Sequence, residues 1–146
     1  MTSKIQIKKT RESKLNQLDF KNSPLGTTFT DHMFVCSFRN EKGQKPKIKP
    51  LNTISTHPAA MVFHYGQAIF EGMKATIDNS GCPLLFRPNE NAKRLNFSAR
   101  RLGMPEFPRK LFVDALKALV SIDQKWIPKS QGSALYLRPF MYADEA

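Results

Sequence analysis

A tyrosine and an arginine near the end of the chain have the types and spacing of an anion-binding pair. Tyr136 and Arg138 stand two residues apart in the run 134–140, which has the composition of a strand. Side chains alternate between the faces of a strand, so both point to one face. A guanidinium among aromatic side chains needs an anion as partner. The pattern favours either an anion site or an ion pair with an acidic residue of the chain, and it leaves both open.

A second unusual segment spans residues 64–72, with the sequence HYGQAIFEG. Its aromatic residues, Tyr65 and Phe70, are bracketed by Gly66 and Gly72. Two aromatic side chains in this setting could line an apolar pocket. The same spacing is also typical of core packing, and the pattern alone favours core packing over a pocket.

Other common signatures of chemistry are missing from the sequence. It contains no phosphate-binding loop, no glycine-rich dinucleotide turn, no nucleophile elbow and no His-Glu-x-x-His motif. We interpret the three histidines as hydrogen-bonded structural residues, because their spacing does not suit a metal: His32, His57 and His64. We interpret Cys36 and Cys82 as reduced, buried or half-buried thiols.

The first half of the chain is expected to be mainly extended. Residues 27–38 are rich in Thr, Phe, Val and Met, which predicts a long strand, central because both faces are partly apolar. Residues 40–44 predict a turn. Residues 47–51, flanked by prolines, predict an edge strand. A short helix is expected over 59–70, with Gly72 just past its end.

The second half predicts a hairpin, two helices and a strand. The hairpin strands are expected at 73–77 and 84–87, around a turn at 78–81. Helices are expected from Pro88 to about 101 and from about 108 to 126, and a strand at 133–142. Strands and helices that do not alternate strictly indicate an α+β fold, a largely antiparallel sheet with helices packed on one face.

Length and charge restrict the class of protein. The 146 residues suit one domain, and we predict a basic arm over 1–24 before a domain over 25–146. No stretch has the features of a membrane span or a targeting peptide, so a cytoplasmic location is the default. The net charge of +11 could attract nucleic acid, but no nucleic-acid-binding motif accompanies it.

Four segments resemble one known family, the branched-chain amino-acid aminotransferases, which are pyridoxal-phosphate enzymes of fold type IV. The similarity covers nearly the whole chain beyond the basic arm. The segments, in order, are TFTDHM at 28–33, HYGQAIFEGMKA at 64–75, LFRPNENAKRL at 85–95 and LYLRPF at 135–140. The resemblance implies the small N-terminal domain of such an enzyme.

The resemblance also implies roles for individual residues. Arg94 matches the arginine that holds the cofactor phosphate, a role that suits a guanidinium fork. Tyr65 and Phe70 match aromatic residues of the substrate side-chain pocket. Tyr136 and Arg138 match a pair near that pocket, which helps to accept both a branched aliphatic chain and the carboxylate of glutamate. The implied assembly is a homodimer in which some of these residues reach the neighbouring site.

The sequence departs from the family at two positions and lacks a large part of it. Leu25 stands where many relatives have an aromatic pocket residue, and Gln44-Lys45 stands where they often have Gly-Trp. The family's cofactor-bonding lysine lies in a larger domain downstream of position 146, and Lys74 matches no such role. We therefore expect no catalytic residue in this chain, and neither cofactor retention nor turnover by residues 1–146 alone.

Three alternative functions remain open on the sequence alone. The charge would suit a basic nucleic-acid- or partner-binding module, which a salt titration of DNA binding would identify. Two other fold type IV enzymes, D-amino-acid aminotransferase and aminodeoxychorismate lyase, share the expected fold. The segments at 70–74 and 136–139 favour the branched-chain enzymes over both.

Overall fold

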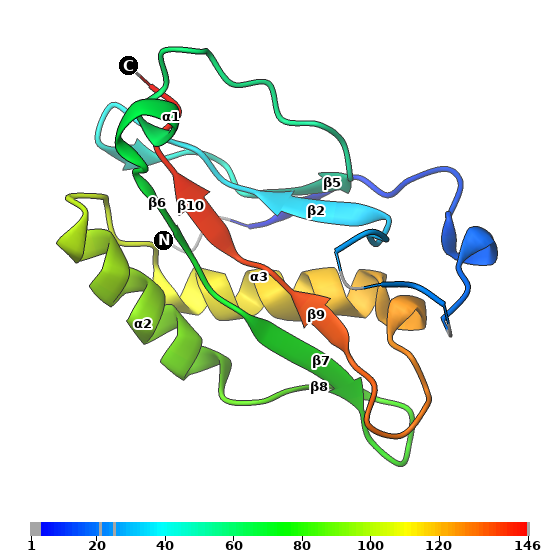
Figure 1. Cartoon of the computed structure of the whole chain (residues 1–146). Helices are drawn as coiled ribbons and strands as arrows, with labels where there is room; N and C mark the ends of the chain where they lie inside the picture. The colour runs from blue at the N-terminus through cyan, green and yellow to red at the C-terminus, as the bar shows by residue number, and fades with distance from the viewer. Residues whose placement is uncertain (1–3, 21, 25, 146) are drawn as a thin grey trace.

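The computed structural model describes residues 4–20, 22–24 and 26–145, and it confirms an α+β fold (Figure 1). The helices are α1 (Met61–Tyr65), α2 (Pro88–Arg101) and α3 (Arg109–Ile122), with 3-10 turns at η1 (Leu15–Gln17) and η2 (Gln124–Trp126). The strands are β1 (Gln6–Ile7), β2 (His32–Val35), β3 (Phe38–Arg39), β4 (Lys42–Gly43), β5 (Lys47–Pro50), β6 (Ala68–Phe70), β7 (Met73–Ile77), β8 (Pro83–Leu85), β9 (Leu135–Leu137) and β10 (Phe140–Tyr142). These strands form small sheets rather than one, in the orders β1-β5-β2, β10-β6, β3-β4 and β8-β7-β9.

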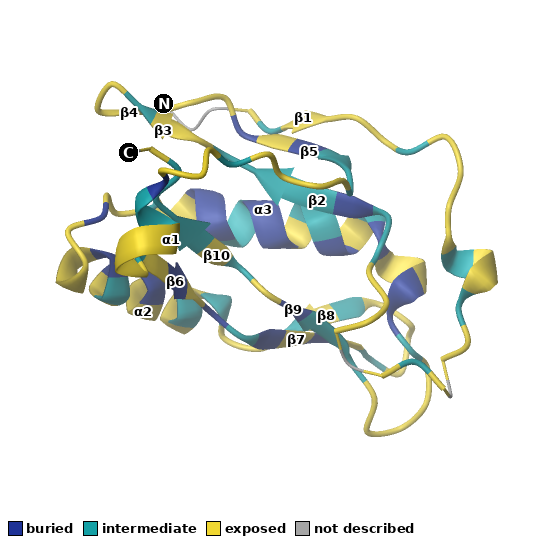
Figure 2. Cartoon of the chain, turned by 45° about the horizontal axis from the view of Figure 1, so that its top comes forward, coloured by how far each residue is buried: buried dark blue, intermediate teal, exposed yellow. Residues whose placement is uncertain are grey.

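The two long helices form where the sequence predicts them. Helix α2 begins at Pro88, whose fixed φ suits a first turn, and Gly103 follows its end with a φ of +65°. Helix α3 ends at Ile122, earlier than expected, and the chain continues as the tighter turn η2. Figure 2 shows buried residues along α3 and on one side of α2.

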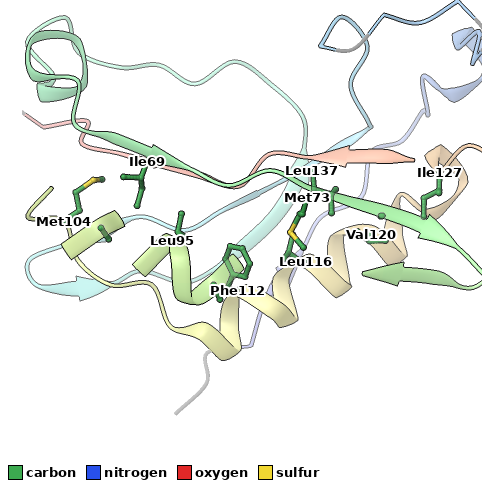
Figure 3. Close-up of a cluster of buried hydrophobic side chains, with 12 residues drawn as sticks. Ile69, Met73, Leu95, Met104, Phe112, Leu116, Val120, Ile127 and Leu137 are labelled. Atoms are coloured by element: carbon green, nitrogen blue, oxygen red, sulfur yellow. The ribbon is translucent and has the colours of Figure 1, made fainter. Parts of the chain in front are cut away.

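The main core lies between these helices and the strands β6, β7 and β9. Its side chains come from the expected helical stripes and from alternate strand positions, and Figure 3 shows them meeting in one layer. Burial of so many apolar side chains, at about 25 cal/mol per Å² of apolar surface, is the main force that holds the helices to this face. The cluster contains Ile69, Met73, Ala75, Ala92, Leu95, Ala99, Met104, Phe112, Leu116, Val120, Ile127 and Leu137.

The expected helix over 59–70 is wrong in its second half. Helix α1 already ends at Tyr65, because Gly66 adopts the left-handed conformation with a φ of +61°. Residues 68–70 then form strand β6, which pairs with β10. The glycine that stops the helix is therefore Gly66, and not Gly72.

The three-stranded sheet β1-β5-β2 reverses the expected positions of two strands. Strand β5, predicted at an edge, is central, because β1 of the N-terminal arm pairs with it in parallel while β2 pairs antiparallel on its other side. The strand expected over 27–38 is wrong in extent, since only His32–Val35 and Phe38–Arg39 are extended in ladders. The arm is thus extended at β1, where it pairs with the domain.

Buried polar contacts also fasten the arm to the domain. His32 accepts a hydrogen bond at Nε2 from the backbone N–H of Thr10 (2.9 Å), so its proton lies on Nδ1, which donates to Asp123 Oδ1 (2.7 Å). Asp31 accepts from the backbone N–H of Lys14 (2.8 Å) and from the indole of Trp126 (3.0 Å). Burial works to raise the pKa of Asp31, but a hydrogen bond from the Ser13 hydroxyl, together with those from Lys14 and Trp126, outweighs it and the pKa is lowered.

The remaining local expectations have mixed outcomes. The turn at 40–44 is confirmed, with Asn40 and Glu41 at positive φ between β3 and β4. The strand expected at 84–87 is wrong at its end, because Arg87 adopts a left-handed conformation before Pro88 starts α2. Cys82 is exposed, contrary to expectation, and Cys36 is half-buried; both are free thiols. Leu25 lies outside the described residues.

None of the helices in the described ranges is both long and apolar enough to cross a membrane.

Candidate functional site

The candidate site lies where a two-stranded ribbon is interrupted. Strands β6 and β7 run antiparallel to β10 and β9, with Phe70 opposite Phe140 and Met73 opposite Leu137. Between these pairs, Glu71-Gly72 on one side and Arg138-Pro139 on the other leave the regular ladder. Proline has no N–H for such a ladder, which explains the interruption at Pro139. One hydrogen bond crosses it, from the Glu71 N–H to the Pro139 carbonyl (2.8 Å).

Three of the predicted site residues meet on the outer side of this ribbon. The guanidinium carbon of Arg138 lies 4.3 Å from the ring centre of Phe70 and 5.2 Å from that of Tyr136. Arg138 Nη2 also donates a hydrogen bond to the Tyr136 hydroxyl (2.7 Å). The predicted shared face of Tyr136 and Arg138 is therefore confirmed. We call these three residues the aromatic–arginine cluster.

Arg138 has no acidic partner within the described part of the chain. The ion pairs found there involve other residues, and none includes Arg138. Within the described residues, Arg138 therefore does not form the ion pair with an Asp or Glu that the sequence left open as an alternative. A cation held by ring faces, with its outer side open, can receive a carboxylate from another molecule.

Gly72 lies directly against the aromatic–arginine cluster. A side chain at this position would overlap the Tyr136 hydroxyl, and its Cβ would stand 3.3 Å from Tyr136 Cζ. Glycine is therefore required for Tyr136 to keep its present position. The φ of Gly72 is not positive, so close approach, rather than backbone conformation, explains the residue.

Arg94 lies on helix α2 and is held by Glu71. Its Nε donates to Glu71 Oε1 (2.8 Å) and its Nη2 to Oε2 (2.6 Å). Asn91, one turn earlier on α2, donates to the same Oε2 (2.8 Å). Glu71 has only 2% of its side chain exposed, whereas Arg94 has 66% exposed. A buried carboxylate thus fixes an arginine that otherwise faces solvent.

Hydrogen bonding controls the ionisation of this pair. Burial works to raise the pKa of Glu71, but the hydrogen bonds from Arg94 and Asn91 and the charge of Arg94 outweigh it, so the pKa is lowered. The hydrogen bond to Glu71, together with its charge, raises the pKa of Arg94. Both groups are therefore charged at neutral pH.

The donors that Arg94 retains fit a phosphate group. Glu71 occupies the edge formed by Nε and Nη2, and among the described residues no acceptor binds Nη1. The end of the guanidinium, with Nη1 and the second Nη2 proton, can still grip two phosphate oxygens. Binding of the cofactor phosphate by Arg94 remains a prediction, and the geometry of its free donors is compatible with it.

Tyr65 lies apart from the other predicted residues. It ends helix α1 with 78% of its surface exposed, and the ring contact that it makes is with His64, at 6.3 Å between centres. Phe70 is 62% exposed. The core-packing alternative for Tyr65 and Phe70 is therefore wrong, because both rings face solvent. Tyr65 makes no contact with the aromatic–arginine cluster in the described residues.

A cavity of about 2040 Å³ reaches one side of the cluster. Tyr136 and Arg138 contribute to its lining, whereas Tyr65, Phe70 and Arg94 do not. The described residues thus do not enclose all five predicted residues in one pocket. Four of them fall in two neighbouring groups, the aromatic–arginine cluster and the Glu71–Arg94 pair, which are joined through the consecutive residues Phe70 and Glu71, and Tyr65 belongs to neither.

The histidines are hydrogen-bonded, as the sequence predicts. His32 is buried against Asp123; His57 Nδ1 accepts from the N–H of Ala59 (3.1 Å); and His64 Nε2 lies 2.9 Å from the Pro58 carbonyl oxygen. In the ranges that the structure describes, no group of His, Cys, Asp or Glu is arranged to hold a metal ion.

Two residues of the site are not among those predicted from the sequence. Glu71 lies within the motif at 64–72, and it falls in phase with the core-facing positions Ile69 and Met73. A carboxylate at a core phase of a strand needs a buried partner, and this was the available signal. Gly72 carried no such signal, because its need arises from Tyr136, sixty-four residues later in the chain.

Comparison with known proteins agrees with the motifs. The chain is 44% identical, over 99% of its length, to branched-chain-amino-acid aminotransferase 2 of Bacillus subtilis, and it covers 39% of that protein. It is 46% identical over 82% of its length to branched-chain-amino-acid transaminase 1 of the same species, covering 34%. The mitochondrial branched-chain-amino-acid aminotransferase of Schizosaccharomyces pombe is 40% identical over 96% of the chain, with 34% covered.

No family model matches the chain. The chain spans less than half the length of the curated relatives that it matches. The matches nevertheless extend over the segments that the sequence analysis singled out, at identities that leave no doubt about common ancestry. The chain is therefore related to the branched-chain-amino-acid aminotransferases, as its motifs predict.

Proposed function

We propose that this chain forms part of a pyridoxal-phosphate-dependent transaminase, which transfers an amino group between leucine, isoleucine or valine and 2-oxoglutarate. The proposal has two supports, the names of the similar proteins and the chemistry of the aromatic–arginine cluster. The similar proteins are named as branched-chain-amino-acid aminotransferases. The aromatic–arginine cluster offers apolar surface and a positive charge side by side.

The single observation that carries the proposal is the setting of Arg138. A transaminase of this kind accepts two unlike side chains at one place, an aliphatic chain and a carboxylate. The rings of Phe70 and Tyr136 supply apolar contact for the first, and Arg138 supplies charge-assisted hydrogen bonds for the second. The Tyr136 hydroxyl accepts a hydrogen bond from the guanidinium and holds it in place when no carboxylate is bound.

Arg94 is the residue of this chain that we assign to the cofactor. Its free end would receive the phosphate of pyridoxal phosphate, with Glu71 and Asn91 holding the guanidinium from the other side. When bound, pyridoxal phosphate supplies the electron sink for transamination. The described residues contribute binding and orientation, and we assign no proton transfer to any of them.

The exposed ring of Tyr65 fits the proposed homodimer. A tyrosine with 78% of its surface exposed can reach a neighbouring subunit, in keeping with a substrate-pocket role that its own chain does not complete. The homodimer and a cytoplasmic location remain predictions from the sequence.

The test uses the longer protein that contains this sequence. We expect Arg138→Gln to reduce kcat/KM for 2-oxoglutarate by about ten- to a hundredfold, the value of one charge-assisted contact, while kcat/KM for leucine changes less than threefold. Arg101→Gln, at the exposed end of α2, serves as the matched control and should leave both values unchanged. Absence of leucine–2-oxoglutarate turnover in the unaltered holoenzyme would refute the proposed function.

A further inference from the structure

Three consecutive residues each contact a different residue of the candidate site. Phe70 lies under Arg138. Glu71 binds Arg94 through two hydrogen bonds. Gly72 leaves the space that Tyr136 occupies. Glu71 is buried in phase with Ile69 and Met73 and points to the helix side, whereas Phe70 points to the outer side, where Gly72 leaves room for Tyr136.

Glu71 occupies a position that the alternation reserves for apolar residues. Ile69, Met73 and Ala75, in the same phase, are all buried in the core. A charged side chain in that phase lowers stability unless it is fully paired. The pairing is complete, because Asn91 and Arg94 together satisfy both carboxylate oxygens. A leucine or methionine could pack at this position without needing any polar partner. The carboxylate therefore has a role other than packing.

We propose that Glu71 is a positioning residue, which holds the Arg94 guanidinium in the orientation required to bind the phosphate of the cofactor. The proposal rests on the proposed function, since it takes Arg94 as the phosphate ligand. It adds a residue that acts through Arg94 and does not touch the phosphate itself.

The contrast in exposure supports orientation as the role of Glu71. Arg94 is 66% exposed and could sample many rotamers, and restricting them on binding would weaken the affinity for the phosphate. Glu71 is buried and its carboxylate is also held by Asn91, so it can restrict the arginine before the phosphate arrives. Its negative charge acts in the opposite sense, because it partly neutralises Arg94. The two effects predict opposite results on removal of the carboxylate.

The backbone of Glu71 extends the same control to the substrate side. Its N–H donates to the carbonyl of Pro139, the residue after Arg138 (2.8 Å). A single residue therefore ties the arginine on α2 and the arginine of the ribbon into one frame.

The experiment compares two probes that differ by the phosphate alone. In the apo form of the longer protein, dissociation constants are measured for pyridoxal phosphate and for pyridoxal. The ratio is the dissociation constant of pyridoxal divided by that of pyridoxal phosphate. It falls when the phosphate contact is lost, whereas general damage to the fold weakens the binding of both probes and leaves the ratio unchanged. We expect Arg94→Ala to reduce the ratio about ten- to a hundredfold and Glu71→Gln about three- to tenfold. In the Arg94→Ala background, Glu71→Gln should change the ratio less than twofold.

The control is Glu106→Gln. It removes the carboxylate that pairs with another arginine of α2, Arg100 (2.6 Å), from the segment after the helix, and should leave the ratio unchanged. If Glu71→Gln fails to fold, Asn91→Ala replaces it, because this change loosens the carboxylate but keeps the charge pair. A phosphate-selective loss of about two- to threefold is then expected.

The outcomes distinguish the positioning role of Glu71 from the assignment of Arg94 to the phosphate. The positioning role is overturned, and the proposed function left intact, if Arg94→Ala clearly reduces the ratio but Glu71→Gln leaves it unchanged or increases it. Where Asn91→Ala replaces Glu71→Gln, an unchanged ratio in that variant has the same meaning. An equal loss for both probes also overturns it, since that indicates a structural role alone. An unchanged ratio in Arg94→Ala overturns the phosphate assignment, and the positioning role with it.

Discussion

Gly72 and Tyr136 face each other across the interrupted ribbon so closely that no side chain fits at position 72. An added Cβ would overlap the phenolic oxygen of Tyr136, while the ring carbons lie at ordinary or slightly tight contact distance, with Cζ at 3.3 Å. The hydroxyl in that position is also the acceptor for Arg138. A glycine in one strand thus sets where the arginine of the other strand is held.

The first prediction follows from this overlap. Gly72→Ala should destabilise the protein by about 1–3 kcal/mol, the usual effect of overpacking, because Tyr136 must move. Gly72→Ala combined with Tyr136→Phe should recover most of that loss, since the overlapping atom is gone and Cζ at 3.3 Å is the nearest remaining neighbour. Urea unfolding of the wild type and the two variants measures both values. A double variant no more stable than Gly72→Ala would contradict the geometry.

The second prediction concerns the hydroxyl of Tyr136 alone. Tyr136→Phe keeps the ring next to Arg138 but removes the hydrogen-bond acceptor at 2.7 Å. Arg138 should lose orientation but keep its charge, so KM for 2-oxoglutarate in the longer protein should rise only about three- to tenfold, the range of a typical single hydrogen bond. The KM for leucine should stay within twofold. Steady-state kinetics with each substrate in turn provides the measurement.

The third prediction concerns the buried pair of His32 and Asp123. His32→Ala should destabilise the protein by about 2–4 kcal/mol, because it leaves a buried carboxylate without its main partner. It also removes the acceptor for the Thr10 N–H, so limited proteolysis should cut the arm faster. His57→Ala is the control, since His57 is exposed and accepts one local hydrogen bond. Equal stability of the two variants would contradict the arrangement.

The fourth prediction concerns the dependence of stability on pH. A carboxyl whose pKa is lower in the folded than in the unfolded chain stabilises the fold above the unfolded value, about 4.3 for Glu, and this stabilisation disappears as the pH falls through the folded value. The pKa of Glu71 is lowered. Wild type should therefore exceed Glu71→Gln in stability by about 1–3 kcal/mol at pH 7, with a smaller difference near pH 3. Chemical unfolding at both pH values tests this, and a difference that grows on acidification would be the opposite result.

Several elements could be predicted from the sequence because their determinants are local. Helix α2 needs only Pro88 at its start, an apolar stripe and Gly103 beyond its end, and these are visible in a window of sixteen residues. The hairpin around 78–81 has the same property. The family resemblance was likewise visible in short motifs, and the comparisons confirm it.

The strand positions were decided by pairing and not by local pattern. Strand β5 reads as an edge because prolines flank it, yet the arm supplies β1 and makes it central. The run 133–142 reads as one strand, and the structure divides it at Arg138-Pro139, opposite the interruption after Phe70. Such choices depend on partners far away in the chain, which no short window contains.

For the site, the sequence by itself determined which side chains are present and that Tyr136 and Arg138 share a face, because a period of two is a property of any strand. Only the tertiary structure decided that Phe70 lies under Arg138, that Glu71 holds Arg94, and that Gly72 must be glycine. These relations join strands β6 and β7 to helix α2 and to the last ribbon strands. They exist because core burial on one face of the ribbon presses these elements together, and a linear pattern does not encode that distance.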